Sequence, residues 1–271
     1  MKIIKGDDMQ TTAVLRAFPG RPNLNNVPHS IDGCAHRGQA SATCQTCGLR
    51  ELCIPAGLAL REIDQLNSII NRKRPLKRGD YLYRTGSALQ SIYAVRTGFL
   101  KSCVLHDDGR EQVAGFHMMG ELLGMDAIGS GNHMCDAIAL EDSEVCEIPF
   151  AELERLGRDI PALQQHFHRI MSREITRDYG VMLLLGSMRA EERLAAFLLN
   201  LSQRFVARGY SSTQFILRMT REEIGSYLGL KLETVSRAFS HFQNEGMISV
   251  HGKDIEIKAI ERIRAMLGQA A

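Results

Sequence analysis

The chain has 271 residues, of which 44% are hydrophobic and 24% are charged, and this balance is typical of a globular protein of about two domains. The formal net charge is only +2, so any nucleic-acid site must be a local patch rather than a uniformly basic surface. No apolar run reaches the roughly 18 residues that span a bilayer, and charges interrupt the first segment, MKIIKGDDMQ, so we expect a cytoplasmic protein without a signal peptide.

The first 43 residues predict a loose tail, because the segment FPGRPNLNNVPHSIDG is rich in Pro, Gly and Asn and lacks apolar periodicity. The stretch CQTCGLRELC follows the tail and places Cys44, Cys47 and Cys53 close together. In a reducing compartment, such clustering indicates metal binding or redox chemistry rather than structural disulfides. Spacing alone fits zinc and an iron–sulfur cluster equally well, because both accept four thiolates.

Residues 57–71 predict a short amphipathic helix, because their apolar residues recur at nearly helical spacing. Residues 76–150 predict a small antiparallel β-sandwich or barrel, with HDDGR at 106–110 as a hairpin turn. Its expected strands are the segments YLYR, SIYAV, FLKSCVL, EQVAGFH and SEVCEI. Cys103 and Cys135 are expected to be packing residues, while Cys34 falls in the tail. The histidines of this region are expected to lie at the surface or in the core: His106, His117 and His133.

Residues 160–186 predict a long helix with two apolar faces. One face has the 4, 3, 4, 3 spacing of a heptad seam, which predicts a homodimer interface made by Met171, Ile175, Asp178, Met182 and Leu185. The other face is expected to pack on the β domain through Leu163, Phe167 and Ile170. The alternative is that both faces are covered within one chain. Asp178 puts a carboxylate on the seam, where an unpaired buried charge is costly, so the dimer is predicted to be marginal and switchable.

Residues 190–258 predict a DNA-binding domain. A helix over 191–205 precedes Thr220–Gly246, in which a capped helix, a turn at Gly229 and a second helix have the helix-turn-helix layout. The segment GMISVHGKDIEIK adds two strands as a wing. On the second helix, an exposed face suited to reading base edges is formed by Glu233, Ser236 and Arg237. The alternative for this face is an ordinary charged helix surface.

This order of elements resembles the CRP/FNR superfamily of bacterial regulators, and within it the FNR/ANR branch of oxygen-responsive regulators. The resemblance is carried by the segments CQTCGLRELC, YAVRTGFLKS, GFHMMGELLGMDAIGSG, VCEIPF, LLLGSMRAEERLAAFLLNLSQRF and IGSYLGLKLETVSRAF. It implies an α+β fold with an N-terminal β-roll or jelly-roll sensor domain, a long dimerisation helix and a C-terminal winged helix-turn-helix domain. The predicted segments are a tail (1–43), the cysteine loop with the β-roll (44–158), the dimerisation helix (159–188) and the DNA-binding domain (189–271).

The resemblance also implies a [4Fe-4S] cluster held by Cys44, Cys47, Cys53 and Cys146. With the cluster, such a regulator dimerises on TTGAT-type palindromes and works with RNA polymerase in anaerobic metabolism, and oxygen inactivates it. No Arg occurs from Gly120 to Leu140, which argues against a cyclic nucleotide, because its phosphate would lack a charged partner.

Two rival functions remain at this stage. One is a zinc-stabilised or thiol–disulfide regulator with the same DNA site. The other is an iron–sulfur enzyme. The sequence contains neither a phosphate loop nor a dinucleotide fingerprint, so we expect that the protein is not an enzyme.

Overall fold

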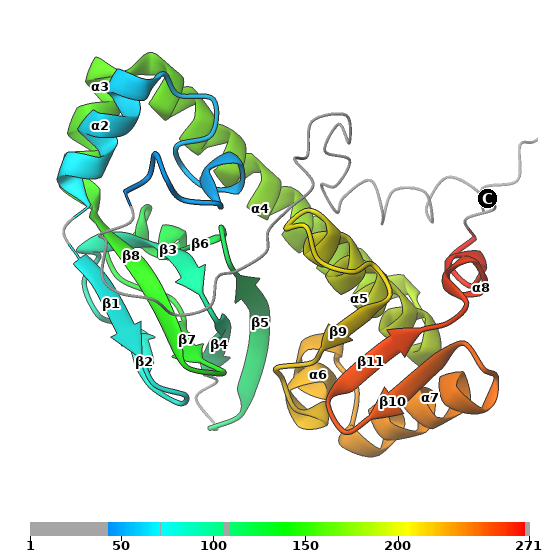
Figure 1. Cartoon of the computed structure of the whole chain (residues 1–271). Coiled ribbons are helices and arrows are strands. Elements are labelled where there is room, and N and C mark those ends of the chain that lie inside the picture. The colour runs from blue at the N-terminus through cyan, green and yellow to red at the C-terminus, as the bar shows by residue number, and fades with distance from the viewer. Residues whose placement is uncertain (1–42, 71, 106–108, 269–271) are drawn as a thin grey trace, which may run out of the picture. The chain divides into compact units, whose positions relative to one another are not determined.

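The structure, a computed structural model, describes residues 43–70, 72–105 and 109–268 (Figure 1). Contacts divide the chain into two compact units, one ending at Met171 and the other beginning at Ser172. The predicted tail, apart from its last residue, lies outside the described residues, as do Cys34, His106 and most of the predicted HDDGR turn. None of the helices in the described part is long and apolar enough to cross a bilayer.

Two four-stranded antiparallel sheets form the β domain of the first unit, in the strand orders β1–β8–β3–β6 and β2–β7–β4–β5 (Figure 1). The strands are β1 (Arg72–Leu76), β2 (Tyr81–Tyr83), β3 (Ser91–Thr97), β4 (Phe99–Leu105), β5 (Glu111–Met118), β6 (Leu122–Leu123), β7 (Asp136–Ala139) and β8 (Ser143–Pro149). The five predicted strands are confirmed. Strands β1, β6 and β7 were not predicted. The β1 segment, RKRPL, is charged and contains Pro, and β6 and β7 are very short, so none of the three has a clear strand pattern.

Strand β3 is buried on both faces, which explains its continuous apolar run. Ile92 and Ala94 belong to a core cluster shared with helices, whereas Tyr93 and Val95 belong to a second cluster between the sheets. Successive side chains of a strand point to opposite faces, so one short strand joins both cores. On β8, the same alternation puts Cys146 on the side that faces the helices.

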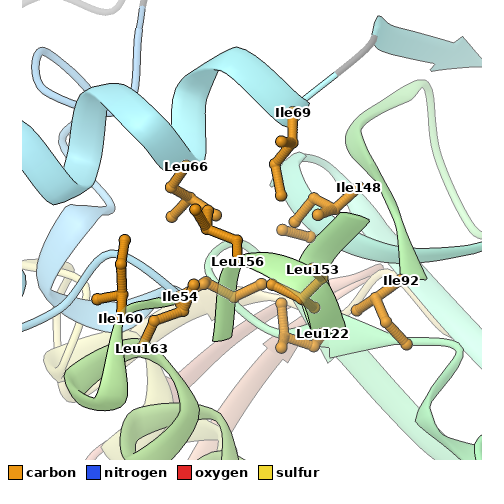
Figure 2. Close-up of a cluster of buried hydrophobic side chains, with 11 residues drawn as sticks. Ile54, Leu66, Ile69, Ile92, Leu122, Ile148, Leu153, Leu156, Ile160 and Leu163 are labelled. Carbon is orange, nitrogen blue, oxygen red and sulfur yellow. The ribbon is translucent and has the colours of Figure 1, made fainter. Parts of the chain in front are cut away.

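Three helices cover that side of the first sheet: α2 (Leu60–Ile69), α3 (Phe150–Asp159) and the start of α4 (Pro161–Ser187). Figure 2 shows the core cluster that they share with the sheet and with the cysteine loop: Ile54, Leu66, Ile69, Ile92, Ala94, Leu122, Ile148, Leu153, Leu156, Ile160 and Leu163. The predicted helix at 57–71 is confirmed with narrower bounds, because the Glu62 carboxylate accepts from the amide of Ala59 and sets the first turn there. Short 3-10 turns occur at η2 (Arg50–Leu52) and η3 (Met125–Ala127).

The second unit contains the rest of α4 and the winged helix-turn-helix. Its further elements are α5 (Ala190–Val206), β9 (Gln214–Ile216), α6 (Arg221–Leu228), α7 (Leu232–Asn244), β10 (Ile248–His251), β11 (Asp254–Ile257) and α8 (Ile260–Ala265). The predicted cap is confirmed, since the Thr220 hydroxyl accepts from the amide of Glu223 at 3.1 Å and the Glu223 carboxylate accepts from the amide of Thr220 at 2.7 Å. Gly229 ends α6 with φ +62°, in the left-handed region that favours glycine. The predicted wing is confirmed as β10 and β11, with β9 as a third strand.

Candidate functional site

Four cysteine side chains line one cavity between the cysteine loop and the first sheet: Cys44, Cys47, Cys53 and Cys146. All four are free thiols and partly buried. The cavity contains about 430 Å³ that protein atoms do not fill, its open mouth included. Apart from Arg50 and Arg96, the other lining residues are apolar. Residues far apart in the sequence thus bring four sulfur donors to one space.

The loop is fastened to α2 near its first cysteine. The amide of Cys44 donates to the side-chain oxygen of Asn67 at 3.2 Å. The side-chain amide of Gln45 donates to the carboxylate of Asp64. Both partners lie on α2, so the first cysteine is held by a helix that itself packs into the core.

The other end of the loop is fastened to the core and to α4. Ile54 is 1% exposed and belongs to the same cluster as Leu163 of α4 (Figure 2). The Nε2 atom of His166 lies 3.2 Å from the carbonyl oxygen of Cys53. Sequence patterns do not indicate this contact, because it joins His166 to a backbone atom 113 residues away.

Burial favours the protonated form of the thiol at Cys44, Cys53 and Cys146. It raises the pKa of Cys44 to about 11 and that of Cys53 to about 12, and the neighbouring thiols add to both shifts. Burial also raises the pKa of Cys146, an effect that the charge of Arg96 opposes. Metal ligands are thiolates, so a bound metal has to displace these protons. The guanidinium of Arg96, which is paired with Glu144, is one source of compensating positive charge.

The spacing of the thiols bears on which group they fit. Within residues 43–70, 72–105 and 109–268, no three His, Cys, Asp or Glu side chains converge on a point where one metal ion is held. A zinc ion needs its four sulfurs about 2.3 Å from one point. The four thiols that line the cavity do not meet this requirement as they stand, and four thiolates are also the ligand set of a [4Fe-4S] cluster.

Within the described residues, the other cysteines and histidines of the β domain are buried, which agrees with the predicted packing roles: Cys103, Cys135, His117 and His133. Cys103 and Cys135 are 2% and 8% exposed. His133 stacks on Tyr83 with ring centroids 3.7 Å apart, and its Nδ1 atom lies 3.3 Å from the carboxylate of Asp126. These contacts assign His133 to the core rather than to the cysteine cavity. His117 is also buried and lies outside the cavity lining.

The two faces of α4 differ in burial. Leu163 is buried, and Phe167 and Ile170 pack against the same core, as predicted. On the predicted seam, Ile175 and Met182 are 53% and 59% exposed, so this face is not covered within the described part of one chain. Met171 and Leu185 of the seam are partly exposed.

Asp178 is exposed in the single chain, yet its surroundings already disfavour its charge. Partial desolvation raises the pKa of its carboxyl, and the nearby Arg177 opposes the shift. Arg177 is itself paired with Glu174 at 2.9 Å. Tyr179, one residue beyond Asp178, is 60% exposed and widens the apolar strip of the seam.

The face that was predicted to read base edges lies on α7 (Leu232–Asn244). The residues predicted for it are all exposed: Glu233, Ser236 and Arg237. The opposite side of α7 is buried, with Val235 and Phe242 at 0% exposure. The helix is therefore held by its apolar side while three polar side chains point away from the core.

Two residues that the sequence analysis missed hold this arrangement. A Cβ on Gly225 would lie 2.6 Å from the carbonyl oxygen of Leu230, and the amide of Leu230 donates to the carbonyl of Gly225 at 2.8 Å. A glycine inside a short helix lowers helix stability. Its presence at such a position is therefore the sequence signal that could have indicated a close backbone approach. Arg193 donates to three backbone carbonyls, those of Leu185, Met188 and Leu228, and no spacing in the sequence reveals it.

Family models match both parts of the chain. A model of the Crp-like helix-turn-helix domain matches residues 192–266, and a model of the cyclic nucleotide-binding domain matches residues 73–159. With the solved structure of FixK2 from Bradyrhizobium japonicum, the TM-score is 0.68 at 30% identity, over 74% of this chain and 98% of that chain. These matches confirm the predicted α+β fold, a β sensor domain followed by helices and a C-terminal helix-turn-helix domain.

Relatives of known name cover most of the chain. It is 48% identical over 231 residues to the fumarate and nitrate reduction regulatory protein of Escherichia coli strain K12, which covers 85% of this chain and 92% of that protein. It is 45% identical over 229 residues to the transcriptional regulatory protein btr of Bordetella pertussis, which covers 84% of this chain and 95% of that protein.

Proposed function

The chain belongs to the CRP/FNR family of DNA-binding transcriptional regulators, and from this premise we propose that it is an oxygen sensor that controls genes of anaerobic metabolism. The observation that supports the proposal most strongly is the set of four cysteines around one cavity. The name of the Escherichia coli relative, which refers to fumarate and nitrate reduction, agrees with a role in anaerobic metabolism. We expect no catalytic activity, because the relatives are named as regulators.

In this proposal Cys44, Cys47, Cys53 and Cys146 are the ligands of a [4Fe-4S] cluster. When bound, the cluster supplies thiolate-ligated iron that reacts with oxygen. The chain supplies the donors, the apolar walls that limit access of water, and the positive charge of Arg96 beside Cys146. Two ligands lie at or next to the contacts with Asn67 and His166, so the occupancy of the site determines how firmly the loop is held on α2 and α4.

The proposed output is a change in dimerisation. The seam of α4, with Met171, Ile175, Asp178, Met182 and Leu185, forms the homodimer interface. The exposed apolar residues favour association, and the carboxylate of Asp178 opposes it unless it is protonated, paired or turned to solvent. A balance of this kind is easily shifted, since a change of 1.4 kcal/mol alters a dimerisation constant about tenfold and couplings of about 1–3 kcal/mol are typical.

The dimer would place two copies of α7 one turn of DNA apart, as a palindromic site requires. We propose that Arg237 donates to a guanine edge, that Glu233 accepts from the amino group of a cytosine, and that Ser236 takes either role. A carboxylate facing DNA is unfavourable unless it reads a base, so Glu233 contributes specificity. We propose that the half-site is of the TTGAT type and that the bound dimer contacts RNA polymerase. The proposed location is the cytoplasm. The proposed segments of the chain are a tail, a sensor domain, a dimerisation helix and a DNA-binding domain, which end at residues 43, 158, 188 and 271.

The proposal is tested by measuring iron and acid-labile sulfide, with a visible spectrum, on protein purified without oxygen and again after exposure to air. We expect about four irons per chain, as the proposed cluster requires, and a colour that fades as dimers dissociate. A colourless protein that contains zinc, or no metal, would refute the oxygen-sensing mechanism and leave the assignment to the regulator family intact.

A further inference from the structure

A histidine stands on the core-facing side of α4, where helical spacing predicts an apolar residue. His166 lies between Leu163 and Ile170, which both pack against the core cluster. Its side chain is 7% exposed. A buried polar ring costs free energy unless it is hydrogen-bonded, so the partner of His166 indicates why this position is polar.

One partner of His166 is the backbone of the cysteine loop. A carbonyl oxygen only accepts, so the Nε2 atom of His166 carries a proton and donates to the oxygen of Cys53 at 3.2 Å. The same oxygen also accepts from the amide of Ala56 at 3.1 Å, which closes the turn after Cys53. The histidine thus contacts the peptide group of a proposed ligand without being one.

Ile54, the residue after Cys53, also packs near α4. Ile54 follows Cys53, is 1% exposed and belongs to the same cluster as Leu163, one helical turn before His166 (Figure 2). An apolar contact and a hydrogen bond therefore join two successive loop residues to two successive turns of α4. A movement of Cys53 cannot leave the start of α4 unaffected.

Resting on the proposed function, we propose that His166 is a positioning residue that couples the peptide of Cys53 to the dimerisation helix. When Cys53 is held as a ligand, its carbonyl oxygen is fixed and the hydrogen bond holds the first turns of α4. When Cys53 is not held as a ligand, its carbonyl oxygen is less firmly placed, so this hydrogen bond forms for a smaller share of the time and the start of α4 moves more freely. Ile175, on the seam, follows nine residues later, about two and a half turns along the same helix.

The coupling is measured as a ratio, the dimerisation constant with iron bound divided by that without iron. The test uses three variants of the full chain. His166→Leu removes the donor and puts an apolar side chain of similar bulk in its place, whereas His166→Gln keeps an N–H at a similar reach. His168→Leu is the matched control, because His168 is exposed on the same turn of α4.

With full iron content, His166→Leu should lower the ratio by about two- to tenfold, the worth of one hydrogen bond. His166→Gln should restore most of the ratio, and His168→Leu should not change it. An unchanged ratio in His166→Leu overturns the proposal. If His166→Leu also loses iron, the glutamine variant decides: recovery of iron content and ratio supports the role, and a glutamine protein that behaves like the leucine one overturns it.

Hydrogen exchange on iron-free protein separates this inference from the proposed function. His166→Leu should speed the exchange of amides in residues 44–56 and 161–170, and His168→Leu should not. Equal exchange in the two variants overturns the contact between His166 and Cys53, whatever the metal content. A wild-type protein without iron refutes oxygen sensing, and the exchange experiment still decides whether His166 ties the loop to α4.

Discussion

Replacing Arg193 with methionine should loosen the junction between α4, α5 and α6. The guanidinium donates to the carbonyl of Leu185 at 2.8 Å, that of Met188 at 2.9 Å and that of Leu228 at 2.9 Å. These carbonyls lie at or just beyond the ends of α4 and α6, where helices lack internal partners for them. Methionine keeps the length of the side chain and removes every donor, so the variant isolates the hydrogen bonds from the packing.

A hydrogen bond from a charged group contributes about 1.5–3 kcal/mol when buried, but Arg193 is only partly buried and water can replace it at the carbonyls. We therefore take about 1 kcal/mol for each bond and expect the local opening of α5 and α6 to become easier by about 3 kcal/mol, or about a hundredfold. Arg193→Lys, which offers one compact charge instead of a fork, should recover about a third of this effect.

Hydrogen exchange of the α5 and α6 amides measures this opening without requiring the whole chain to unfold in one step. DNA affinity should fall in the same variant, while iron content and the visible spectrum should match the wild type, because Arg193 lies outside the cysteine cavity. If exchange in α6 stays within about twofold of the wild type, the three hydrogen bonds do not hold the junction and the reasoning is refuted.

Three other predictions concern single residues. Gly225→Ala should cost about 2–4 kcal/mol in the stability of the helix-turn-helix, measured by exchange in α6 and α7, because its Cβ would meet the carbonyl of Leu230; unchanged exchange would show that the turn yields freely. Cys146→Ser should prevent assembly of a four-iron cluster while Cys103→Ser, at a buried packing position, should retain it, as iron analysis will decide. Arg237→Met should lower affinity for a palindromic site by about 1–3 kcal/mol with little change on unrelated DNA, and an equal loss on both would make Arg237 a phosphate contact.

The sequence predicts most of the fold because the apolar spacing of each long element matches its burial. The apolar run SIYAV is typical of a strand that is covered on both faces. In agreement with this, Ile92 and Tyr93 belong to different core clusters. The sequence did not predict β1, because the segment RKRPL is extended through its pairing with β8 and its own residues do not favour a strand. The same applies to β9, which lies at the edge of its sheet and pairs with β11.

The residues of the candidate site also differ in whether local sequence information predicts them. Glu233 and Arg237 are predicted from helical spacing, which is local information, and both are exposed on α7. Cys146 was joined to the other cysteines only by family resemblance, and its place beside them follows from the alternation of β8 and the packing of the loop on α2. His166 and Arg193 bind backbone oxygens, which carry no residue-specific signal, so only coordinates reveal them.

In the proposed dimer, Asp178 should make association sensitive to pH, and the raised pKa of its carboxyl gives the direction. Partial desolvation already raises the pKa of its carboxyl above 3.8 in the single chain. Burial at the seam would raise the pKa further, so the proposed dimer would bind protons more tightly than the monomer does. Association is then strongest below the monomer pKa and weakens as pH rises through the dimer pKa.

Two copies of Asp178 take up at most about two protons per dimer, which limits the slope of the logarithm of the association constant against pH to between zero and about minus two. We expect iron-free protein to dimerise more tightly as the pH falls from 7 towards 5, measured by sedimentation equilibrium. Asp178→Asn should flatten that slope and dimerise at pH 7 as well as the wild type does at low pH, because the amide keeps the shape and never ionises. A variant that keeps the wild-type slope would place the titrating group elsewhere, and a variant that stays monomeric at pH 7 would show that Asp178 does not oppose the seam.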